Sequence, residues 1–137
     1  MNSKLEEIVS ALNSATTANG LAITAKVIDQ QEEMIEVLVE EREEFPIIID
    51  IDESQIIAVT NLWRSNEIKE GAEAEMMSAM LAMNLPMPLS AFCRTGDHYQ
   101  LFGAMSIHTL TANIVDEVGV LSDNTLEVFD ALREFLN

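Results

Sequence analysis

The segment from Leu85 to Ser106 constrains the fold more than any other part of the chain, because it joins two apolar runs through a short polar break. Gly96-Asp97 lies in the middle of that break, and glycine at the first position of a two-residue turn tolerates the positive φ that a tight hairpin needs. Two of the three prolines precede the first run, where they end a helix. We therefore predict a β-hairpin with strands Leu89–Thr95 and His98–Ile107.

Four further strands precede the hairpin. Apolar and polar residues alternate along each of them, as in a strand with one buried face, and the segments are Leu21–Val27, Met34–Glu40, Ile47–Ile51 and Gln55–Trp63. Apolar residues at helical spacing predict three helical regions, over roughly Asn2 to Ser14, from a cap at Ser65 or Asn66 to Asn84, and from Leu110 to Asn137. Gly119 and residues 122–124 predict a break in the last region, with Asp123 capping the final helix.

The order of these elements indicates the fold class. Consecutive strands joined by short turns favour an antiparallel sheet with helices packed against it. The order is α-β-β-β-β-α-β-β-α, so we assign the chain to the α+β class. At 137 residues, one domain spanning residues 1–137 is the natural expectation.

The charge of the chain excludes several kinds of partner. Its 24 acidic residues outnumber 7 basic ones, for a formal net charge of −17, so neither nucleic acid nor an anionic membrane surface is an expected partner. The least polar window, Met76 to Cys93, is interrupted by polar residues and prolines, so we expect no insertion into a membrane. The N-terminus is unlike a signal peptide, and the single cysteine suits a reducing compartment. We expect a cytoplasmic protein.

The hairpin also holds a polar constellation that could carry chemistry. Across the turn, Cys93 and His98 lie diagonally on one face, and such a pair can activate a thiolate or ligate zinc. A small enzyme or metal protein that uses these residues, with Asp97 or His108, is therefore the alternative. An exposed turn histidine near a half-buried cysteine explains the same residues without chemistry, and nothing marks an oxyanion site. We predict no catalytic residues, no metal ligands and no cofactor.

Acidic residues gather in one part of the chain. Between Asp29 and Glu53 there are eleven acids and one base, Arg42. Two interpretations stay open: a solvated outer face that discourages aggregation, or a docking surface for a basic partner. The predicted acidic face comprises Glu32, Glu33, Glu36, Glu40, Glu41, Glu43 and Glu44.

Apolar residues on both faces of the hairpin indicate a second subunit. One domain has few helices with which to cover both faces of a sheet, so we predict a homodimer. Five of the eight methionines fall within twelve residues, and methionine is favoured on surfaces that accept varied partners. The candidate subunit or partner surface comprises Met77, Met87, Phe92, Leu101, Phe102 and Met105.

The segment from Met87 to Ser106 resembles a known family. Residues 87–90, the Gly96-Asp97 turn and residues 101–104 are similar to the small acidic bacterial proteins typified by YjfI, a domain family of unknown function. The resemblance brings no assigned catalytic residues and implies an accessory role in a phage-shock-like membrane-stress system. The element order also resembles the dimeric secretion-chaperone fold, in which small acidic proteins bind partner segments. We expect a non-enzymatic adaptor or chaperone-like module that binds a basic or apolar segment of another protein.

Overall fold

An antiparallel sheet is the centre of the fold. A computed structural model describes the backbone of residues 3–137 and the side chains of residues 4–137, so the predicted helix start at Asn2 lies outside the described residues. Within them, six strands form one sheet in the order β1-β2-β3-β4-β6-β5. Their bounds are β1 Ile23–Asp29, β2 Met34–Val39, β3 Ile47–Ile51, β4 Gln55–Arg64, β5 Ala91–Thr95 and β6 His98–Ser106. Within residues 3–137, the α-helices are α1 Ser3–Asn13, α2 Glu73–Asn84 and α3 Thr111–Leu132. The α+β class and the element order are confirmed.

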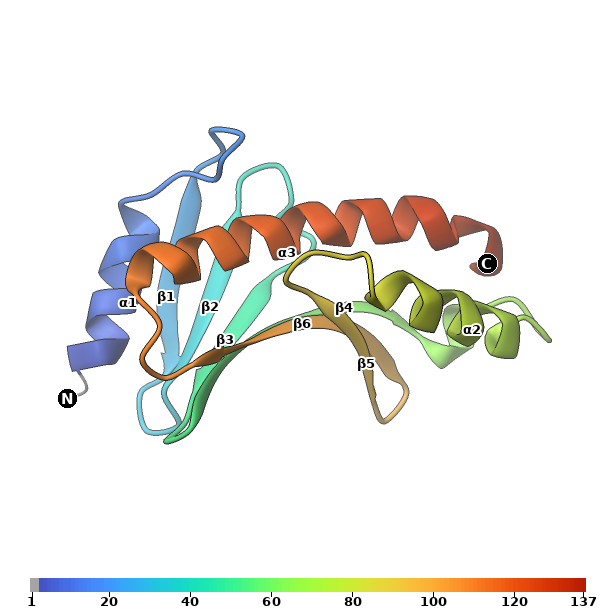
Figure 1. Ribbon diagram of the computed structural model, residues 1–137, viewed down its shortest axis with the longest axis horizontal. Helices are drawn as coiled ribbons and strands as arrows, with labels where there is room; N and C mark the ends of the chain where they lie inside the picture. The colour runs from blue at the N-terminus through green and yellow to red at the C-terminus, as the bar shows by residue number, and fades with distance from the viewer. Residues whose placement is uncertain (1–2) are drawn as a thin grey trace.

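The helices lie over one face of the sheet. α3 runs along that face, with α1 beside β1 at one end and α2 beside β5 at the other (Figure 1). Alternate strand residues point toward this helical layer and are buried. The residues between them, such as Ile48, Val59 and Phe102, share the opposite face and are only half-buried, because no helix within residues 3–137 covers it.

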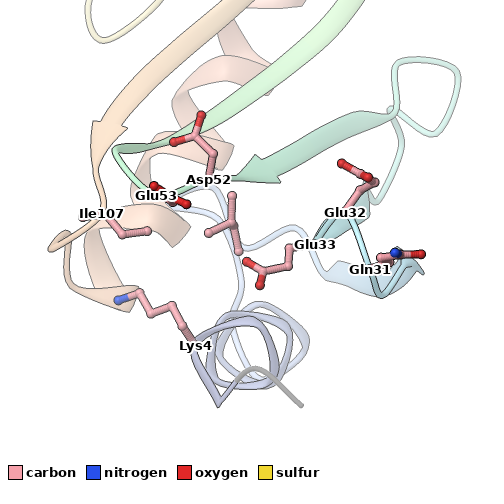
Figure 2. Close-up of a pocket in the computed structure, with 8 residues that line it drawn as sticks. Lys4, Gln31, Glu32, Glu33, Asp52, Glu53 and Ile107 are labelled. Carbon is pink, nitrogen blue, oxygen red and sulfur yellow. The ribbon is translucent and has the colours of Figure 1, made fainter.

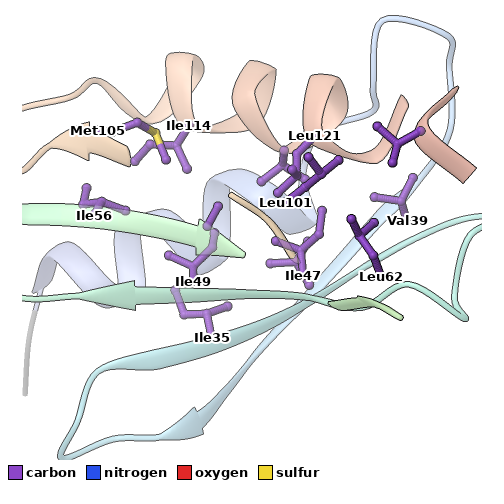
Figure 3. Packing of buried hydrophobic residues seen from close by; sticks show 14 of the residues in the cluster. Ile35, Val39, Ile47, Ile49, Ile56, Leu62, Leu101, Met105, Ile114 and Leu121 are labelled. Carbon is purple, nitrogen blue, oxygen red and sulfur yellow. The ribbon is translucent and has the colours of Figure 1, made fainter. Parts of the chain in front are cut away.

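The core lies between α3 and the sheet. Ile114 and Leu121 of α3 point toward Met105 and Leu101 of β6 (Figure 3), and none of the four is more than 8% exposed. Full burial of an aliphatic side chain of this size contributes about 1.5–3 kcal/mol. This layer of α3 against the sheet therefore supplies much of the stability of the fold.

The predicted hairpin is confirmed. Gly96 has a φ of 61°, as the first turn position requires, and Thr95 lies opposite His98 across the turn. The first strand starts at Ala91 and not at Leu89, because Leu89 has a φ of 62°. An extended strand needs a negative φ.

α2 begins at Glu73, so the predicted start at Ser65 or the next residue is wrong. The backbone of this region already has partners in other parts of the fold. Ser65 N–H donates to the carbonyl of Asp97 at 2.9 Å, and Lys69 N–H donates to the carbonyl of Phe135 at 2.8 Å. The segment therefore links the hairpin turn to the C-terminal tail, and the cap-like residues at its start form only a short 3-10 helix, Ser65–Glu67, and not the start of α2.

The predicted break in the last helix is also wrong, because α3 is continuous over 22 residues. Gly119 lies in mid-helix where α3 passes Thr17, and it does not end the helix. Ser122, at the start of the polar triplet, is buried, and Asp123 binds Arg42 instead of capping a helix. Tertiary contacts of these polar residues outweigh their intrinsic preference for turns.

Candidate functional site

α2 carries an exposed apolar stripe. Met77, Leu81 and Leu85 follow one another at intervals of four residues, which places them on one side of the helix, and they are 40%, 73% and 94% exposed. No charged residue occurs between Glu75 and Arg94, in a chain whose net charge is −17. A helix that is apolar all round is usually covered. This one therefore presents a surface that another protein can cover.

A shallow groove lies beside the stripe, between α2 and β5. Its volume is about 180 Å³, and apolar side chains such as Met80 and Leu81 form most of its wall. Of the predicted surface residues, Met77 and Phe92 line this groove, whereas Met87 is half-buried in a separate hollow beside α3. The stripe and the groove together form one apolar surface.

Tyr99 fixes the start of α2 to β6. Its hydroxyl donates to the carboxylate of Glu73, and the guanidinium of Arg94 lies 5.2 Å from its ring centroid. Burial, and then the hydrogen bond with Glu73, raise the pKa of Tyr99 to about 12. The phenol is therefore neutral at physiological pH and positions α2 against the sheet.

The structure gives no support to chemistry at Cys93 and His98. Cys93 lies opposite Gln100, as the hairpin register predicted, and its Sγ contacts the amide oxygen of Gln100 at 3.6 Å. Burial raises the pKa of the Cys93 thiol, whereas an activated cysteine needs a lowered one. His98 Nε2 accepts a hydrogen bond from Arg64, and its Nδ1 lies 3.2 Å from a carboxylate oxygen of Asp97. Within residues 3–137, no group of three His, Cys, Asp or Glu side chains could hold a metal ion.

Two asparagines that the sequence analysis missed hold the segment between α2 and β5. Asn84 Oδ1 accepts a hydrogen bond from Phe92 N–H at 2.8 Å. Asn124, buried on α3, donates to the Pro88 carbonyl at 2.9 Å and to the Ser90 hydroxyl at 3.0 Å. These bonds position the apolar surface. Asn124 lies 36 and 34 residues from its two partners, so only a known fold would have identified its role.

Three predicted surface residues on β6 have different positions. Phe102 is half-buried on the helix-free face of the sheet. Leu101 and Met105 are 0% and 8% exposed beneath α3, so they belong to the core of the chain itself. This corrects their assignment to a subunit surface: α3 covers the face of the hairpin that the sequence analysis left open.

The predicted acidic face is divided between the two ends of β2. Glu32 and Glu33 precede the strand, residues 40–44 follow it, and a six-residue strand separates them by about 20 Å. Glu36 lies between, on the helix-free face of the sheet, where Lys26 pairs with it at 3.6 Å. The acids therefore form two separate groups and not one docking surface.

The first of these acidic groups borders a hollow of about 590 Å³ at one end of the sheet. Figure 2 shows the residues that line it, among them Lys4, Glu32, Glu33, Asp52 and Glu53. Asp52 accepts backbone N–H groups of Ser54 and Gln55 within its own turn, and these bonds lower its pKa. Lys4 donates to the carbonyl of Thr109 at 3.1 Å. Asp52 and Lys4 thus already stabilise local structure.

Comparison with known proteins identifies the fold and the family. No helix within residues 3–137 is both long and apolar enough to cross a membrane, and no curated protein matches the chain. Among solved structures, the chain is similar to the Yersinia pestis type III secretion chaperone SycH, solved in complex with a stable fragment of YscM2. The TM-score is 0.60 at 17% identity, over 92% of this chain and 97% of that chain. This match confirms the chaperone-like fold predicted from the element order. A family model described as "Uncharacterized protein conserved in bacteria (DUF2170)" matches residues 2–136, so the chain belongs to the DUF2170 family.

Proposed function

We propose that this protein is a non-enzymatic, chaperone-like protein-binding module that acts as a homodimer in the cytoplasm. The observation that carries the proposal is the apolar stripe of α2, Met77, Leu81 and Leu85, which the chain's own fold leaves exposed. Contiguous exposed apolar patches mark sites of protein interaction. The similarity to a secretion chaperone supports this function by analogy of fold.

The distribution of charge favours a second copy of the chain as the partner that covers the α2 stripe. Two molecules of net charge −17 repel one another over most of their surfaces. The charge-free stretch between Glu75 and Arg94 can meet its counterpart without opposing acids. Side chains four residues apart form a ridge, and two such ridges interdigitate at about −50°. A two-fold axis then places the stripe of each molecule against the groove of the other.

Light scattering coupled to size exclusion tests the dimer. The wild-type protein should have the mass of a dimer at micromolar concentration, and Leu81→Lys should have the mass of a monomer with an unchanged circular dichroism spectrum. Leu110→Lys is the matched control, because Leu110 is 69% exposed and Leu81 is 73% exposed. A monomeric wild type contradicts the homodimer. A dimer that Phe102→Lys disrupts and Leu81→Lys does not would move the interface to the helix-free face of the sheet.

The narrower resemblance to proteins typified by YjfI supports an accessory role beside a phage-shock-like membrane-stress system. Affinity purification of the chain from its native cells, with and without membrane stress, tests this role by mass spectrometry. We expect phage-shock-like proteins to be enriched with the wild type under stress. If phage-shock-like proteins are recovered equally from stressed and unstressed cells, or are not recovered at all, the accessory role is contradicted.

A further inference from the structure

Another hollow, of about 540 Å³, lies between the β2–β3 loop and the end of α3. The ring centroids of Phe45 and Phe129 are 4.8 Å apart, and Trp63 meets Phe129 edge-on at 5.1 Å. Leu126, which is 37% exposed, adds an aliphatic wall, whereas Trp63 is only 3% exposed and supports the aromatic pair from the core. We name this site the Phe45–Phe129 hollow.

The loop that carries Phe45 is fixed to α3. Arg42 donates to Asp123 and, at 3.2 Å, to the hydroxyl of Ser122, and its side chain is only 13% exposed. Phe45 N–H donates to the Arg42 carbonyl at 3.0 Å. Charge-assisted bonds therefore hold the two walls together, and a partner need not order the loop in order to bind.

Acidic groups surround the aromatic pair. Glu127 and Asp130 line the hollow, and the loop adds two glutamates directly before Phe45. Arg133 is the cation in this lining, and it pairs with Asp130 at 3.4 Å. The two side chains are 77% and 83% exposed, so the pair is weak and a cation from a ligand can replace it.

We propose that the Phe45–Phe129 hollow binds an amphipathic basic segment of a partner protein. An apolar side chain of that segment packs on the aromatic pair, and a lysine or arginine lies beside Glu127 and Asp130. A second copy of this chain does not fit here, because its acidic surfaces would oppose these two carboxylates and its charge-free stretch between Glu75 and Arg94 offers them no cation. The inference rests on the proposed function as a protein-binding module, and it adds a partner chemistry and a surface separate from the α2 stripe.

The single tryptophan, Trp63, makes binding measurable by fluorescence. The probe is a tryptophan-free amphipathic helical peptide built of leucine and lysine, titrated at physiological ionic strength so that long-range attraction is screened. We expect a saturable change in Trp63 emission. The same peptide with glutamate in place of lysine should cause none. Absence of a saturable change with the lysine peptide overturns the proposal.

Matched variants distinguish binding at the Phe45–Phe129 hollow from general attraction of the peptide by the net negative charge of the chain. Glu127→Gln with Asp130→Asn should weaken binding about fivefold, since two exposed ion pairs are lost. Glu6→Gln with Glu7→Gln removes the same charge from α1 and should change the affinity less than about twofold. Likewise Leu126→Ser should weaken binding, and Leu110→Ser should not.

Equal weakening by both double variants, or by both serine variants, overturns the site. Light scattering on the same samples measures the oligomeric state, and so it tests the proposed homodimer independently of the peptide-binding site. If the protein is a dimer and the variants at Glu127, Asp130 and Leu126 do not weaken peptide binding, the proposed binding site is wrong and the proposed homodimer is supported. A monomer that shows the expected variant pattern supports the hollow and contradicts the homodimer.

Discussion

The side-chain amide of Asn13 forms two hydrogen bonds with the backbone of Ala25. Its Oδ1 accepts from the Ala25 N–H and its Nδ2 donates to the Ala25 carbonyl, each at 2.8 Å. Ala25 lies on the edge strand β1, so the amide takes the place of a neighbouring strand. At the other edge, Asn84 Oδ1 accepts one hydrogen bond from the Phe92 N–H of β5. Side-chain amides thus occupy backbone groups of both sheet edges and discourage pairing with a foreign strand.

Asn13→Ala should lower the free energy of unfolding by about 1–3 kcal/mol, because two backbone groups lose their partner. Urea denaturation followed by circular dichroism measures the change, and one cooperative transition is also what a single domain predicts. Asn19→Ala is the control, since Asn19 makes only exposed bonds of 3.4 Å to Asp123. Equal loss in both variants would mean that Asn13 contributes no edge protection.

Tyr99 should ionise at higher pH in the folded protein than in the unfolded chain. Its folded pKa of about 12 lies above the ordinary value of about 10, so the stability that it contributes is present below about pH 10 and lost as the pH rises through 12. Tyrosinate absorbance measures this directly, because the chain has one tyrosine.

Glu73→Gln should lower the Tyr99 midpoint without returning it to the ordinary value, because burial is the larger cause of the shift. Urea-unfolded protein supplies the reference titration. A folded-state midpoint equal to that reference would show that the phenol is in contact with water.

The strands and the hairpin could be predicted from the sequence because they depend on local chemistry. Alternation placed the strands of the sheet to within about two residues, and Gly96-Asp97 identified the turn and therefore the pairing of Cys93 with Gln100. The two errors in the helices have the opposite cause. Ser65 and Asp123 have local preferences for caps, but the hairpin turn and Arg42 use their hydrogen-bonding groups across the fold.

The apolar surface could be predicted only in part. Met77 and Phe92 were identified, but Leu81 and Leu85 were not, although their spacing and the absence of charge nearby were visible in the sequence. Which face of a short apolar helix is covered depends on its packing against β5, and periodicity does not reveal it when both sides are apolar.

Cys93→Ser should change neither the stability nor the binding of partners by much. Because burial raises the pKa of the thiol, little thiolate exists at neutral pH, and reaction with an aromatic disulfide reagent should be slower than for the same cysteine in urea. A thiol that reacts faster in the folded state, or a large functional loss in Cys93→Ser, would revive the alternative of a small enzyme or metal protein.

Two glycine-to-alanine changes should have opposite effects on stability. At Gly103 a Cβ would lie 2.5 Å from a carboxylate oxygen of Glu117 and 3.0 Å from the backbone carbonyl of Leu89. The Glu117 side chain can rotate but the backbone carbonyl cannot easily move, so Gly103→Ala should destabilise the protein by about 1–3 kcal/mol. At Gly119 the new atom comes no closer than 3.5 Å to Thr17, and alanine in mid-helix should stabilise by up to about 1 kcal/mol. The midpoints of urea denaturation of the two variants and the wild type measure these changes. If both variants were less stable than the wild type, α3 would pack more tightly against the Thr17 loop than these contacts indicate.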